Sequence, residues 1–571
     1  MPIATTFDRR TLLLHVLAVL AYGTMLMYGP LGESTQAEQI YTLVLSTSFT
    51  LVLLFVTRRI AFSLLASAAL FMLIDVSSIL KYIYMTTPLL APDLVYFINA
   101  DTLEVISHYP LLLLASFVGL VVAPMMLYGI WRIDAQRLFA VYRPWLRRSL
   151  TALGLLVSGS VLTMTSLPDG PFREIYAKGM WLAMNDKSYL TDFFISFYST
   201  QIESPKLVEG AEKLAVWNEQ VASVGDPRQR PDIVAVLEES TFDPAMLAVC
   251  KLPVCKSKLF QPDARTRAHG YLQVHTWGGG TWTSEFAFLT SMAHVLFGNA
   301  GLYAPFNLAP RVEYSLPRVL RENGYRTIAI YPMSGSFLNA RNAYGFYGFD
   351  QFYDGTEYGL GWKANDFDLL AAFDKIYAAE RKAHPGVPLF VFMLTLRQHG
   401  PHMTPLGELP VPYNKPLFPK KLDAWLNLNL GNYLARLNES EQAMAQLERR
   451  LLDSDQRTVL LHFGDHQPSF DGAINVLEKV VPKGVSDPTK ITYYVLKSNF
   501  PLREKFDLPV LDIIYLGSLL LDVADLRKND FYEASTLLRD RCKGRYFDCP
   551  VPRLQDSYHA YVYGVLHALR D

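Results

Sequence analysis

The stretch that decides the fold of most of this chain is residues 458–468, Thr-Val-Leu-Leu-His-Phe-Gly-Asp-His-Gln-Pro. An apolar, β-branched run leads into a glycine and then into a pair of polar side chains. Comparable runs occur at 233–237, 327–331 and 389–394, with helix-like stretches between them. Buried strands that alternate with helices predict a layered α/β fold with a parallel sheet. In such a sheet, functional side chains gather at the carboxyl ends of the strands.

The first of these strand ends carries two adjacent acids. Residues 232–240 read Asp-Ile-Val-Ala-Val-Leu-Glu-Glu-Ser. Neighbouring side chains on a strand point to opposite faces, so only one of Glu238 and Glu239 is able to serve a site. Taken alone, the motif is more simply explained as two exposed acids at a strand end.

A glycine-rich segment precedes a threonine. Residues 275–285 read His-Thr-Trp-Gly-Gly-Gly-Thr-Trp-Thr-Ser-Glu. We expect a helix over 281–293, which places Thr281 at its N-terminus. Free backbone amides and the helix dipole favour an anion there and lower the cost of an alkoxide. The alternative is a glycine-rich turn followed by a threonine that caps the helix.

Two further strand ends carry histidines. Residues 395–402 read Thr-Leu-Arg-Gln-His-Gly-Pro-His, which suits the binding of an anion or a leaving group, although a histidine pair in a loop is often only surface. Asp465 and His466 are good ligands for zinc or manganese. An adjacent pair needs a sharp turn to converge, and Gly464 permits one.

The four motifs together predict a single metal centre. Glu239, Asp465 and His466, with the Thr281 oxygen, supply ligands for one divalent ion, Mn²⁺ or Zn²⁺. The ion would lower the pKa of the threonine hydroxyl and offset charge on a phosphate. A two-step transfer follows, in which Thr281 attacks phosphorus, a diacylglycerol-like alcohol leaves, and an acceptor hydroxyl takes the phosphoryl group.

The first ~165 residues differ in texture from the rest of the 571-residue chain. Half of all residues are hydrophobic and 19% are charged, and the apolar residues concentrate at the N-terminus. A formal net charge of -1 gives no electrostatic case for nucleic-acid binding. Runs near the ~20 residues that a bilayer requires predict about five membrane spans. They lie at approximately 11–29, 41–57, 60–80, 111–131 and 149–167.

Basic residues in the short loops predict the orientation of these spans. Arg9, Arg10, Arg58 and Arg59 lie on one side, together with the arginines between spans four and five, so we expect a cytoplasmic N-terminus. With five spans, everything after residue 167 is then outside the cytoplasm. Asp75 within span three is either functional or paired locally with Lys81, which lies near the interface.

The four cysteines all lie in the second part of the chain. They form two close pairs, Cys250 with Cys255 and Cys542 with Cys549. Two local disulfides are the natural interpretation in an oxidising compartment, and four free thiols are the alternative. A zinc site is less favoured, because no histidine accompanies either pair at ligand spacing.

The order of the motifs resembles the alkaline-phosphatase superfamily. Within it, the chain is most similar to the lipoteichoic-acid synthase and sulfatase-like group of membrane phosphoglycerol transferases, with phosphoethanolamine transferases as cousins. The sequence divides into a transmembrane domain at 1–167, a helical connector at 168–230 and an extracytoplasmic α/β/α catalytic domain at 231–571, and this arrangement is also similar to that group. The resemblance implies a phospholipid donor and a glycan or lipid acceptor. The two presumed disulfides favour a periplasmic catalytic domain, and with it an inner-membrane location.

Carried over by position, the resemblance makes Glu239, Asp465 and His466 the metal ligands and Thr281 the nucleophile, which also touches the metal. His399 matches the histidine that contacts the transferred or leaving group. A tryptophan and an arginine that grip glycerol phosphate in lipoteichoic-acid synthase are replaced here by Leu338 and Ala340, which leaves the head group open. The substrate-pocket residues predicted for this chain are Arg341, Arg397, His402 and Trp282.

Three other functions compete with transfer. A phosphatase or phosphodiesterase of the same superfamily would use water in place of the acceptor. A sulfatase would need a Cys or Ser in a Cys/Ser-x-Pro-x-Arg context, and Ser315-Leu-Pro317-Arg318 has the wrong spacing. A catalytically inactive sensor domain would not need the intact set of ligands.

Overall fold

The computed structural model describes residues 9–570, except 86, 98–99, 135–136, 178–186, most of 199–229, 471 and 503–505. The described chain forms two compact units. The first comprises residues 1–83 and 87–201, and the second comprises residues 84–86 and 202–571. Much of the predicted connector at 168–230 lies outside the described residues, so that assignment stays a prediction.

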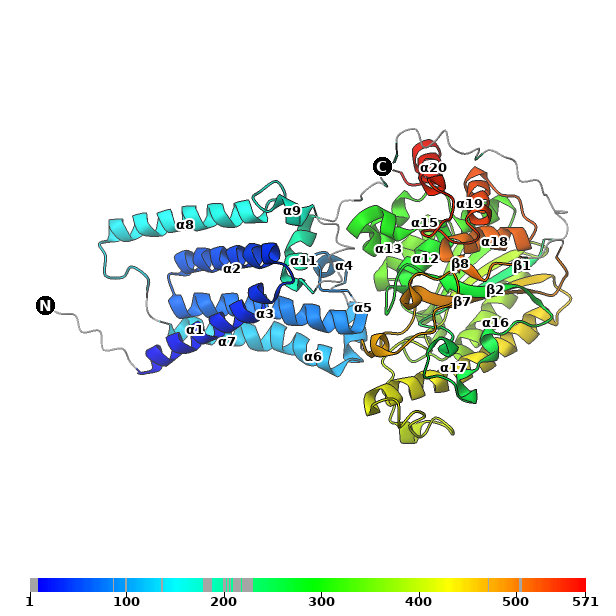
Figure 1. Ribbon diagram of the computed structural model, residues 1–571, viewed down its shortest axis with the longest axis horizontal. Coiled ribbons are helices and arrows are strands. Elements are labelled where there is room, and N and C mark those ends of the chain that lie inside the picture. Colours follow the sequence, from blue (N-terminus) through cyan, green and yellow to red (C-terminus); the bar gives the residue numbers. More distant parts are fainter. Residues whose placement is uncertain are drawn as a thin grey trace. The chain divides into compact units, whose positions relative to one another are not determined.

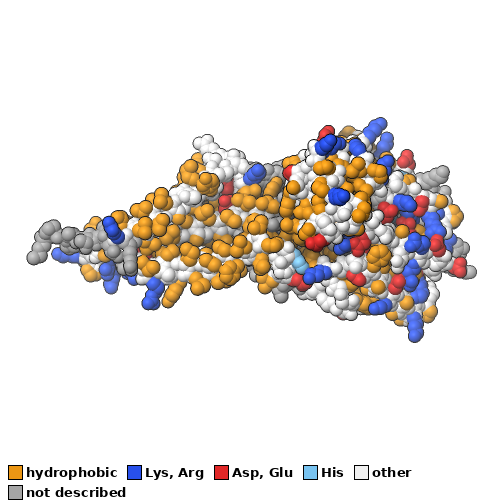
Figure 2. All heavy atoms as spheres, turned by 90° about the horizontal axis from the view of Figure 1, so that it is seen from below, with side chains coloured by type: hydrophobic (Ala, Val, Ile, Leu, Met, Phe, Trp, Pro, Cys, Tyr) orange, Lys and Arg blue, Asp and Glu red, His pale blue; other side chains and the backbone are white. Residues whose placement is uncertain are grey.

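The first unit contains five helices that are long and apolar enough to cross a membrane, as the sequence predicts. In Figure 2, apolar side chains cover much of the visible surface of this unit. At most 39% of any candidate span is buried within the protein, so a bilayer is the natural cover for these side chains. This supports a multi-pass membrane protein. The spans are Thr11–Gly32, Gln36–Thr57, Ile60–Ile83, Pro110–Ile133 and Pro144–Ser166.

The helices of this unit are numbered in the order in which they occur along the chain (Figure 1). Lys81, near the end of α3, pairs with Asp93 at 2.7 Å, so the pairing with Asp75 that the sequence suggested is not found. The long helices are α1 (Arg9–Tyr28), α2 (Gln36–Thr57), α3 (Ile60–Met85), α6 (Pro110–Phe117) continuing into α7 (Ala123–Ile133), and α8 (Pro144–Ser166). Short helices are α4 (Asp93–Tyr96), α5 (Ala100–Ser107), α9 (Arg173–Tyr176) and α11 (Tyr189–Ile195).

An eight-stranded sheet organises the second unit, which we call the outer domain. Its strand order is β4-β3-β5-β1-β6-β7-β2-β8. Strands β4, β3, β5, β1 and β6 are parallel to one another. Strand β7 is antiparallel to both β6 and β2, and β8 is parallel to β2. The strands are β1 (Asp232–Glu238), β2 (Thr266–Gln273), β3 (Arg326–Tyr331), β4 (Gln351–Asp354), β5 (Leu389–Leu394), β6 (Thr458–Gly464), β7 (Ile491–Ser498) and β8 (Val510–Asp512).

Two hydrophobic cores cover the two faces of this sheet, which confirms the predicted α/β/α layering. Alternate residues of β1 divide between them: Ile233, Ala235 and Leu237 enter one core, and Val234 and Val236 enter the other. The first core is formed with α12 (Thr281–Thr290), α14 (Leu316–Glu322), α15 (Ala340–Tyr347), α18 (Leu516–Val523), α19 (Asp530–Arg541) and α20 (Leu554–His559), and the second with α16 (Asp366–Ala383) and α17 (Ala424–Leu452).

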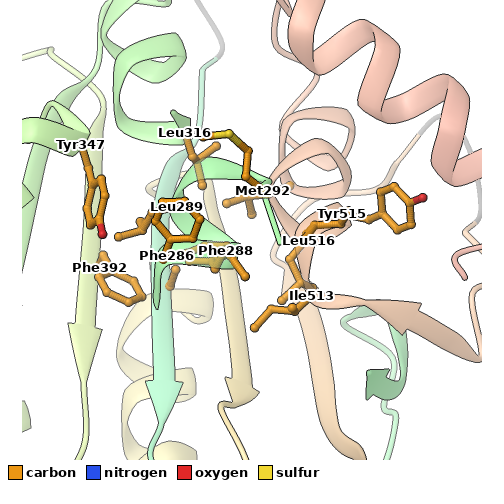
Figure 3. Close-up of a cluster of buried hydrophobic side chains, with 14 of the residues drawn as sticks. Phe286, Phe288, Leu289, Met292, Leu316, Tyr347, Phe392, Ile513, Tyr515 and Leu516 are labelled. Atoms are coloured by element: carbon orange, nitrogen blue, oxygen red, sulfur yellow. The ribbon is translucent and has the colours of Figure 1, made fainter. Parts of the chain in front are cut away.

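Helix α12 is fixed in the first core by its aromatic face. Figure 3 shows Phe286 and Phe288 of this helix beside Phe392 of β5. The ring centroids of Phe288 and Phe392 are 5.6 Å apart. The helix ends at Thr290 rather than at the predicted residue 293, because Ser291 adopts a left-handed conformation (φ 54°). Burial of the helix from residue 283 to 290 fixes the position of its N-terminus.

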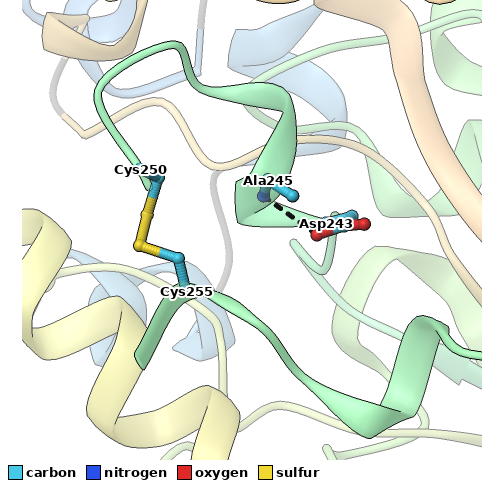
Figure 4. The surroundings of a disulfide bond; sticks show 4 residues. All are labelled: Asp243, Ala245, Cys250 and Cys255. Atoms are coloured by element: carbon cyan, nitrogen blue, oxygen red, sulfur yellow. Dashed lines mark hydrogen bonds between the residues drawn. A yellow bond between two sulfur atoms is a disulfide. The ribbon is translucent and has the colours of Figure 1, made fainter. Parts of the chain in front are cut away.

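Both predicted disulfides are present, and the alternative of free thiols is wrong. Cys250 bonds to Cys255 and Cys542 bonds to Cys549. The first closes a loop after β1 (Figure 4), where the Asp243 carboxylate also accepts a hydrogen bond from the Ala245 amide at 2.9 Å.

Candidate metal centre

Three buried side chains meet at the carboxyl ends of β1 and β6. One ligand atom from each of Glu239, Asp465 and His466 lies within 4.8 Å of the other two, and no other such group occurs among the described residues. The parallel register places Glu238 beside Gly464, so the residues that follow both strands emerge together. Carboxylate and imidazole donors in this arrangement suit a divalent ion such as zinc or manganese.

Gly464 allows the two strand ends to approach closely. A β-carbon at this position would lie 1.9 Å from the Thr241 carbonyl oxygen. The sequence suggested that this glycine was needed for a sharp turn, but Gly464 is the last residue of β6 and its φ is not positive. It is instead needed because the backbone after β1 occupies the space of a side chain.

Backbone amides orient the Asp465 carboxylate. Its Oδ1 accepts hydrogen bonds from the Ser240 and His466 amides, each at 2.7 Å. Its Oδ2 is buried without a hydrogen-bond partner. The Ser284 hydroxyl donates to the Asp465 carbonyl oxygen at 2.8 Å, which ties α12 to the end of β6. One carboxylate oxygen is therefore held in place while the other remains available as a ligand.

The His466 ring presents Nε2 to the same position. Its Nδ1 lies 2.9 Å from the Gln467 carbonyl oxygen, which can only accept, so Nδ1 carries the hydrogen and Nε2 offers a lone pair. That Nε2 is 3.2 Å from Asp465 Oδ2 and 3.7 Å from Glu239 Oε1. This tautomer is the one that a metal-binding histidine needs.

Glu239 is buried and incompletely satisfied. Its Oε1 accepts a hydrogen bond from the Ser240 hydroxyl at 2.7 Å, while its Oε2 is buried without a partner. Burial, followed by the nearby Asp465 carboxylate, raises the pKa of Glu239 above its usual range. Two buried carboxylates beside each other are costly without a compensating cation, so the chemistry of these donors fits a bound divalent ion.

Thr281 completes the cluster from the N-terminus of α12. Its Oγ1 lies 3.3 Å from His466 Nε2. The preceding Gly280 has a φ of 86°, and a β-carbon there would meet the Thr276 hydroxyl at 3.0 Å. The Gly278 amide donates to the Gln467 carbonyl oxygen at 3.0 Å. The glycine-rich segment therefore binds to the loop after β6 and places the threonine beside the candidate ligands.

His399 lies after β5, in a loop whose backbone is bound by an arginine. Arg436 of α17 donates to the carbonyl oxygens of His399 and Pro401, each at 2.8 Å. His399 Nδ1 is 2.7 Å from the Gly400 carbonyl oxygen, so that nitrogen carries the hydrogen and Nε2 has a free lone pair. Burial lowers the pKa of His399, which keeps the ring neutral at neutral pH.

Two of the predicted pocket residues are engaged in ion pairs. Arg341 Nη2 is 3.1 Å from the Asp354 carboxylate, and the guanidinium stacks over Phe352 at 5.0 Å. Arg397 Nε donates to Glu439 at 2.8 Å. Both arginines already have partners in the outer domain, and their role toward a substrate stays a prediction.

The other two predicted pocket residues pack into the domain. The His402 ring lies 5.3 Å from the Phe470 ring and 5.8 Å from that of Tyr433, and burial lowers the pKa of His402 well below its usual value. Trp282 Nε1 donates to the Leu302 carbonyl oxygen at 2.7 Å. Nothing in these contacts tests a substrate-binding role, which stays a prediction for both.

Three residues near the site were missed by the sequence analysis. Ser240 orients Glu239 and Asp465, and Arg436 supports the His399 loop. The Trp362 ring packs edge-on against His399, with centroids 4.5 Å apart. Ser240 directly follows Glu239 in the sequence, so its closeness to the candidate metal centre was predictable. Arg436 and Trp362 come from distant parts of the chain, and only the fold brings them to His399.

Part of this chain is similar to known proteins. Residues 231–503 match the sulfatase family model. An uncharacterized protein of Haemophilus influenzae is 30% identical over 355 residues, covering 60% of this chain. A "putative cyclic beta-1,2-glucan modification protein" of Rhizobium meliloti is 28% identical over 253 residues, covering 43% of this chain. The chain spans 62% and 37% of the lengths of these two relatives.

The sulfatase match covers just under half of the chain, and it agrees with the resemblance that the sequence motifs indicated. Solved structures show similarity at low identity. The phosphoglycerol transferase of Streptococcus pyogenes, in complex with sn-glycerol-1-phosphate, is 18% identical with a TM-score of 0.48, over 64% of this chain and 95% of that one. The lipooligosaccharide phosphoethanolamine transferase A of Neisseria meningitidis is 15% identical with a TM-score of 0.49, over 90% of this chain and 98% of that one.

Proposed function

We propose that this protein is a membrane-anchored, metal-dependent phosphotransferase. It moves a phosphoglycerol or phosphoethanolamine head group from a membrane phospholipid to a glycan or lipid acceptor outside the cytoplasm. The observation that carries the proposal is the position of the Thr281 hydroxyl, 3.3 Å from His466 Nε2 at the edge of the buried Glu239, Asp465 and His466 cluster. A hydroxyl at a helix N-terminus, beside metal donors, suits nucleophilic attack on phosphorus.

Glu239, Asp465 and His466 are the residues assigned to hold the ion, with Thr281 as a fourth donor. Their fit rests on the unpartnered Glu239 Oε2 and Asp465 Oδ2 and on the free lone pair of His466 Nε2. A bound Mn²⁺ or Zn²⁺ supplies Lewis-acid stabilisation of phosphate charge and lowers the pKa of a coordinated hydroxyl.

The first half of the reaction transfers the head group to the enzyme. Thr281 Oγ1 forms a bond to phosphorus, and the bond between phosphorus and the diacylglycerol oxygen breaks. The hydroxyl proton of Thr281 ends on the departing diacylglycerol oxygen. The amides at the start of α12 hold the phosphoryl oxygens, because a helix N-terminus favours negative charge.

The second half releases the head group to the acceptor. The acceptor hydroxyl oxygen bonds to phosphorus, the bond to Thr281 Oγ1 breaks, and the acceptor proton returns to that oxygen. We assign the handling of this proton to His399, whose neutral ring offers an Nε2 lone pair because Nδ1 donates to the Gly400 carbonyl. The Trp362 ring and Arg436 hold His399 in that orientation.

Three observations support a location outside the cytoplasm and a glycan acceptor. The disulfides of the outer domain are typical of an oxidising compartment such as a periplasm. The arginine-rich loops between the spans favour a cytoplasmic N-terminus and an inner-membrane location. The name of the Rhizobium relative refers to modification of a cyclic glucan, which supports a periplasmic glycan as acceptor.

The test is the mass of the Thr281 peptide. The full chain is incubated in detergent with Mn²⁺ or Zn²⁺ and a mixture of phosphatidylglycerol and phosphatidylethanolamine, without acceptor. We expect a glycerol phosphate or ethanolamine phosphate adduct on Thr281, which also names the donor. Thr281→Ala should abolish the adduct, while Thr290→Ala, on the same helix but hydrogen-bonded to Phe286, should retain it. Lipid turnover without any adduct on Thr281 would contradict covalent transfer.

A hydrolase of the same superfamily is the second candidate function, because water is able to replace the acceptor hydroxyl. The five apolar helices favour transfer, since they keep the domain next to lipid donors. Release of free head-group phosphate at the same rate with and without a glycan acceptor would support the hydrolase instead.

A further inference from the structure

Two loops of the outer domain expose an unusual share of its apolar side chains. We call residues 403–425 the first loop and 472–485 the second loop. Together they hold about a tenth of the outer domain but six of its fourteen exposed large apolar residues among those described. The six are Met403, Val411, Val476, Val480, Val481 and Trp425, the last of which lies in the first turn of α17. Val411 and Val476 are 79% and 77% exposed, more than any other apolar residue of this domain.

Both loops start at the candidate metal centre. The first follows His399-Gly-Pro-His402, and the second follows His466-Gln-Pro468. The His402 ring lies 5.3 Å from that of Phe470, and both rings pack on Tyr433 of α17. The bases of the two loops are thus joined through a buried aromatic cluster.

The second loop is held in a defined conformation. Ile474 and Leu477 are buried, and residues 478–480 pair with 246–248 near the first disulfide: the Val480 amide donates to Met246 and the Ala248 amide to Glu478. Its inward positions therefore already supply apolar anchors. The neighbouring outward positions are also apolar, although water would favour polar residues there.

The first loop shows the same division. Tyr413 and Phe418 are buried, and Asn432 of α17 bonds to both the amide and the carbonyl of Thr404. Val411 nevertheless points into solvent. The exposed apolar residues of the two loops are therefore not a consequence of unanchored segments.

The charged residues of the two loops indicate which kind of surface binds them. The two loops carry five lysines, Lys415, Lys420, Lys421, Lys479 and Lys483, against three acids, Glu408, Asp423 and Glu478. Apolar side chains interspersed with lysines are typical of surfaces that bind the interface of an anionic bilayer. The five apolar helices of the same chain keep a bilayer within reach at all times, so even a weak contact is populated.

We propose that the first and second loops dock on the surface of an anionic lipid bilayer and bring the metal centre to its lipid donor. Val411, Val476, Val480 and Val481 enter the interfacial region, and the lysines contact lipid phosphates. This proposal rests on the proposed function, because it assumes that the donor is a lipid. It adds that the donor is taken from the bilayer surface at these two loops.

Fluorescence of a labelled residue tests the docking directly. The four native cysteines are all in disulfides, so one added cysteine is labelled alone. The full chain carrying Val476→Cys or Val411→Cys is labelled with a polarity-sensitive dye and reconstituted into vesicles of phosphatidylethanolamine and phosphatidylglycerol with brominated acyl chains. We expect quenching at both positions and none with Asp455→Cys. Asp455 is exposed and precedes the amino end of β6, whereas the candidate metal centre lies at the carboxyl end of that strand.

Kinetics provide the second arm. For Val476→Asp/Val480→Asp/Val481→Asp we expect the ratio of vesicle-lipid turnover to turnover of bis-p-nitrophenyl phosphate, a soluble diester, to fall at least tenfold. Val565→Asp, which changes another exposed valine outside both loops, is the matched control and should leave the ratio as in the wild type.

The two arms separate the possible failures. Absence of quenching at both positions would overturn the docking, even if the kinetic ratio fell, since the loops would then bind something other than the bilayer. Quenching together with an unchanged ratio would overturn the delivery of the donor through these loops. A wild-type chain that cleaves the diester but no phospholipid would end the proposed function, while the quenching would still decide the docking.

Discussion

Glu238 and Glu239 are adjacent at the end of β1, yet they belong to two different buried clusters. Glu239 joins Asp465 and His466 on one side of the strand end, with ligand atoms within 4.8 Å of one another. Glu238 joins His462 on the other side, with Oε1 3.5 Å from His462 Nδ1. Both clusters combine carboxylates with a histidine, but among the described residues only the first brings ligand atoms of three such side chains within 4.8 Å of one another.

The second cluster is only partly satisfied by protein groups, because both Glu238 carboxylate oxygens and His462 Nε2 are buried without a hydrogen-bond partner. His462 Nδ1 is 3.2 Å from the Tyr493 hydroxyl, and Glu448 pairs with Lys497 at 2.7 Å. Burial raises the pKa of Glu238 to about 8 and that of Asp366, which lines the same small pocket, to about 7. Burial also lowers the pKa of His462 to about 3, so Glu238 and His462 are largely neutral near pH 7. Residue types alone therefore do not define a metal site; convergence of unpartnered atoms does.

The largest expected difference between the clusters is in activity. Asp465→Ala should lower turnover by about 10³-fold or more, because a candidate ligand is lost and the site no longer retains its ion. Asp366→Asn, a matched change to a buried acid of the other cluster, should stay within about tenfold of the wild type. Initial rates with a soluble phosphodiester measure both. Equal losses in the two variants would remove the distinction.

Gly464→Ala should produce the next largest effect, now on stability. The added carbon would sit 1.9 Å from the Thr241 carbonyl, so the strand ends must separate at a cost of about 3 kcal/mol or more. Thermal unfolding should show a drop of several degrees together with loss of the metal response. Gly407→Ala, at a position with no atoms within 4 Å, is the control and should unfold like the wild type. A stable Gly464→Ala protein would refute the close approach.

His399→Gln should lower kcat by about 10²-fold while leaving the thermal shift on metal addition unchanged. The ring is assigned to proton transfer and not to metal binding. His269→Gln, an exposed histidine on β2, is the matched control and should have little effect on either readout. If His399→Gln instead abolished the metal response, His399 would belong to the metal centre and the ligand set would need revision.

Glu238→Gln should act on the pH dependence of stability rather than on turnover. The folded pKa of about 8 exceeds the ordinary value of about 4.3, so between these pH values the folded state holds a proton that the unfolded state has lost. The free energy of unfolding of the wild type therefore falls as pH rises through this window. The variant does not ionise at position 238, so its stability does not fall for this reason. The Tm of the variant minus that of the wild type should therefore be greatest near pH 9 and least near pH 5. A pH-independent difference would contradict the burial of an ionisable Glu238.

Much of the fold was predictable because strand and span patterns are local. The runs at 233–237, 327–331, 389–394 and 458–463 became β1, β3, β5 and β6, and the five apolar stretches became five long helices. The antiparallel insertion of β7 between β6 and β2 was not anticipated, because strand order depends on contacts between distant segments. The disulfide pairs were predictable because each pair is close in sequence.

The candidate site divides in the same way. Glu239, Thr281, Asp465 and His466 follow strand ends or open a helix, and a parallel sheet brings such positions to one edge. Arg341 and Arg397 also lie in motif segments, but their ion pairs with Asp354 and Glu439 depend on residues that no local pattern connects to them. The support of His399 by Arg436 is equally non-local.

The most direct test of the metal centre is the number of metal ions bound per chain. The full-length protein, purified in detergent after exposure to Mn²⁺ or Zn²⁺ and removal of free metal, is measured by inductively coupled plasma mass spectrometry beside Asp465→Ala and Asp366→Asn. The account predicts about one ion per chain in the wild type and in Asp366→Asn, and none retained in Asp465→Ala. Equal, stoichiometric metal in all three proteins, or in none of them, would contradict it.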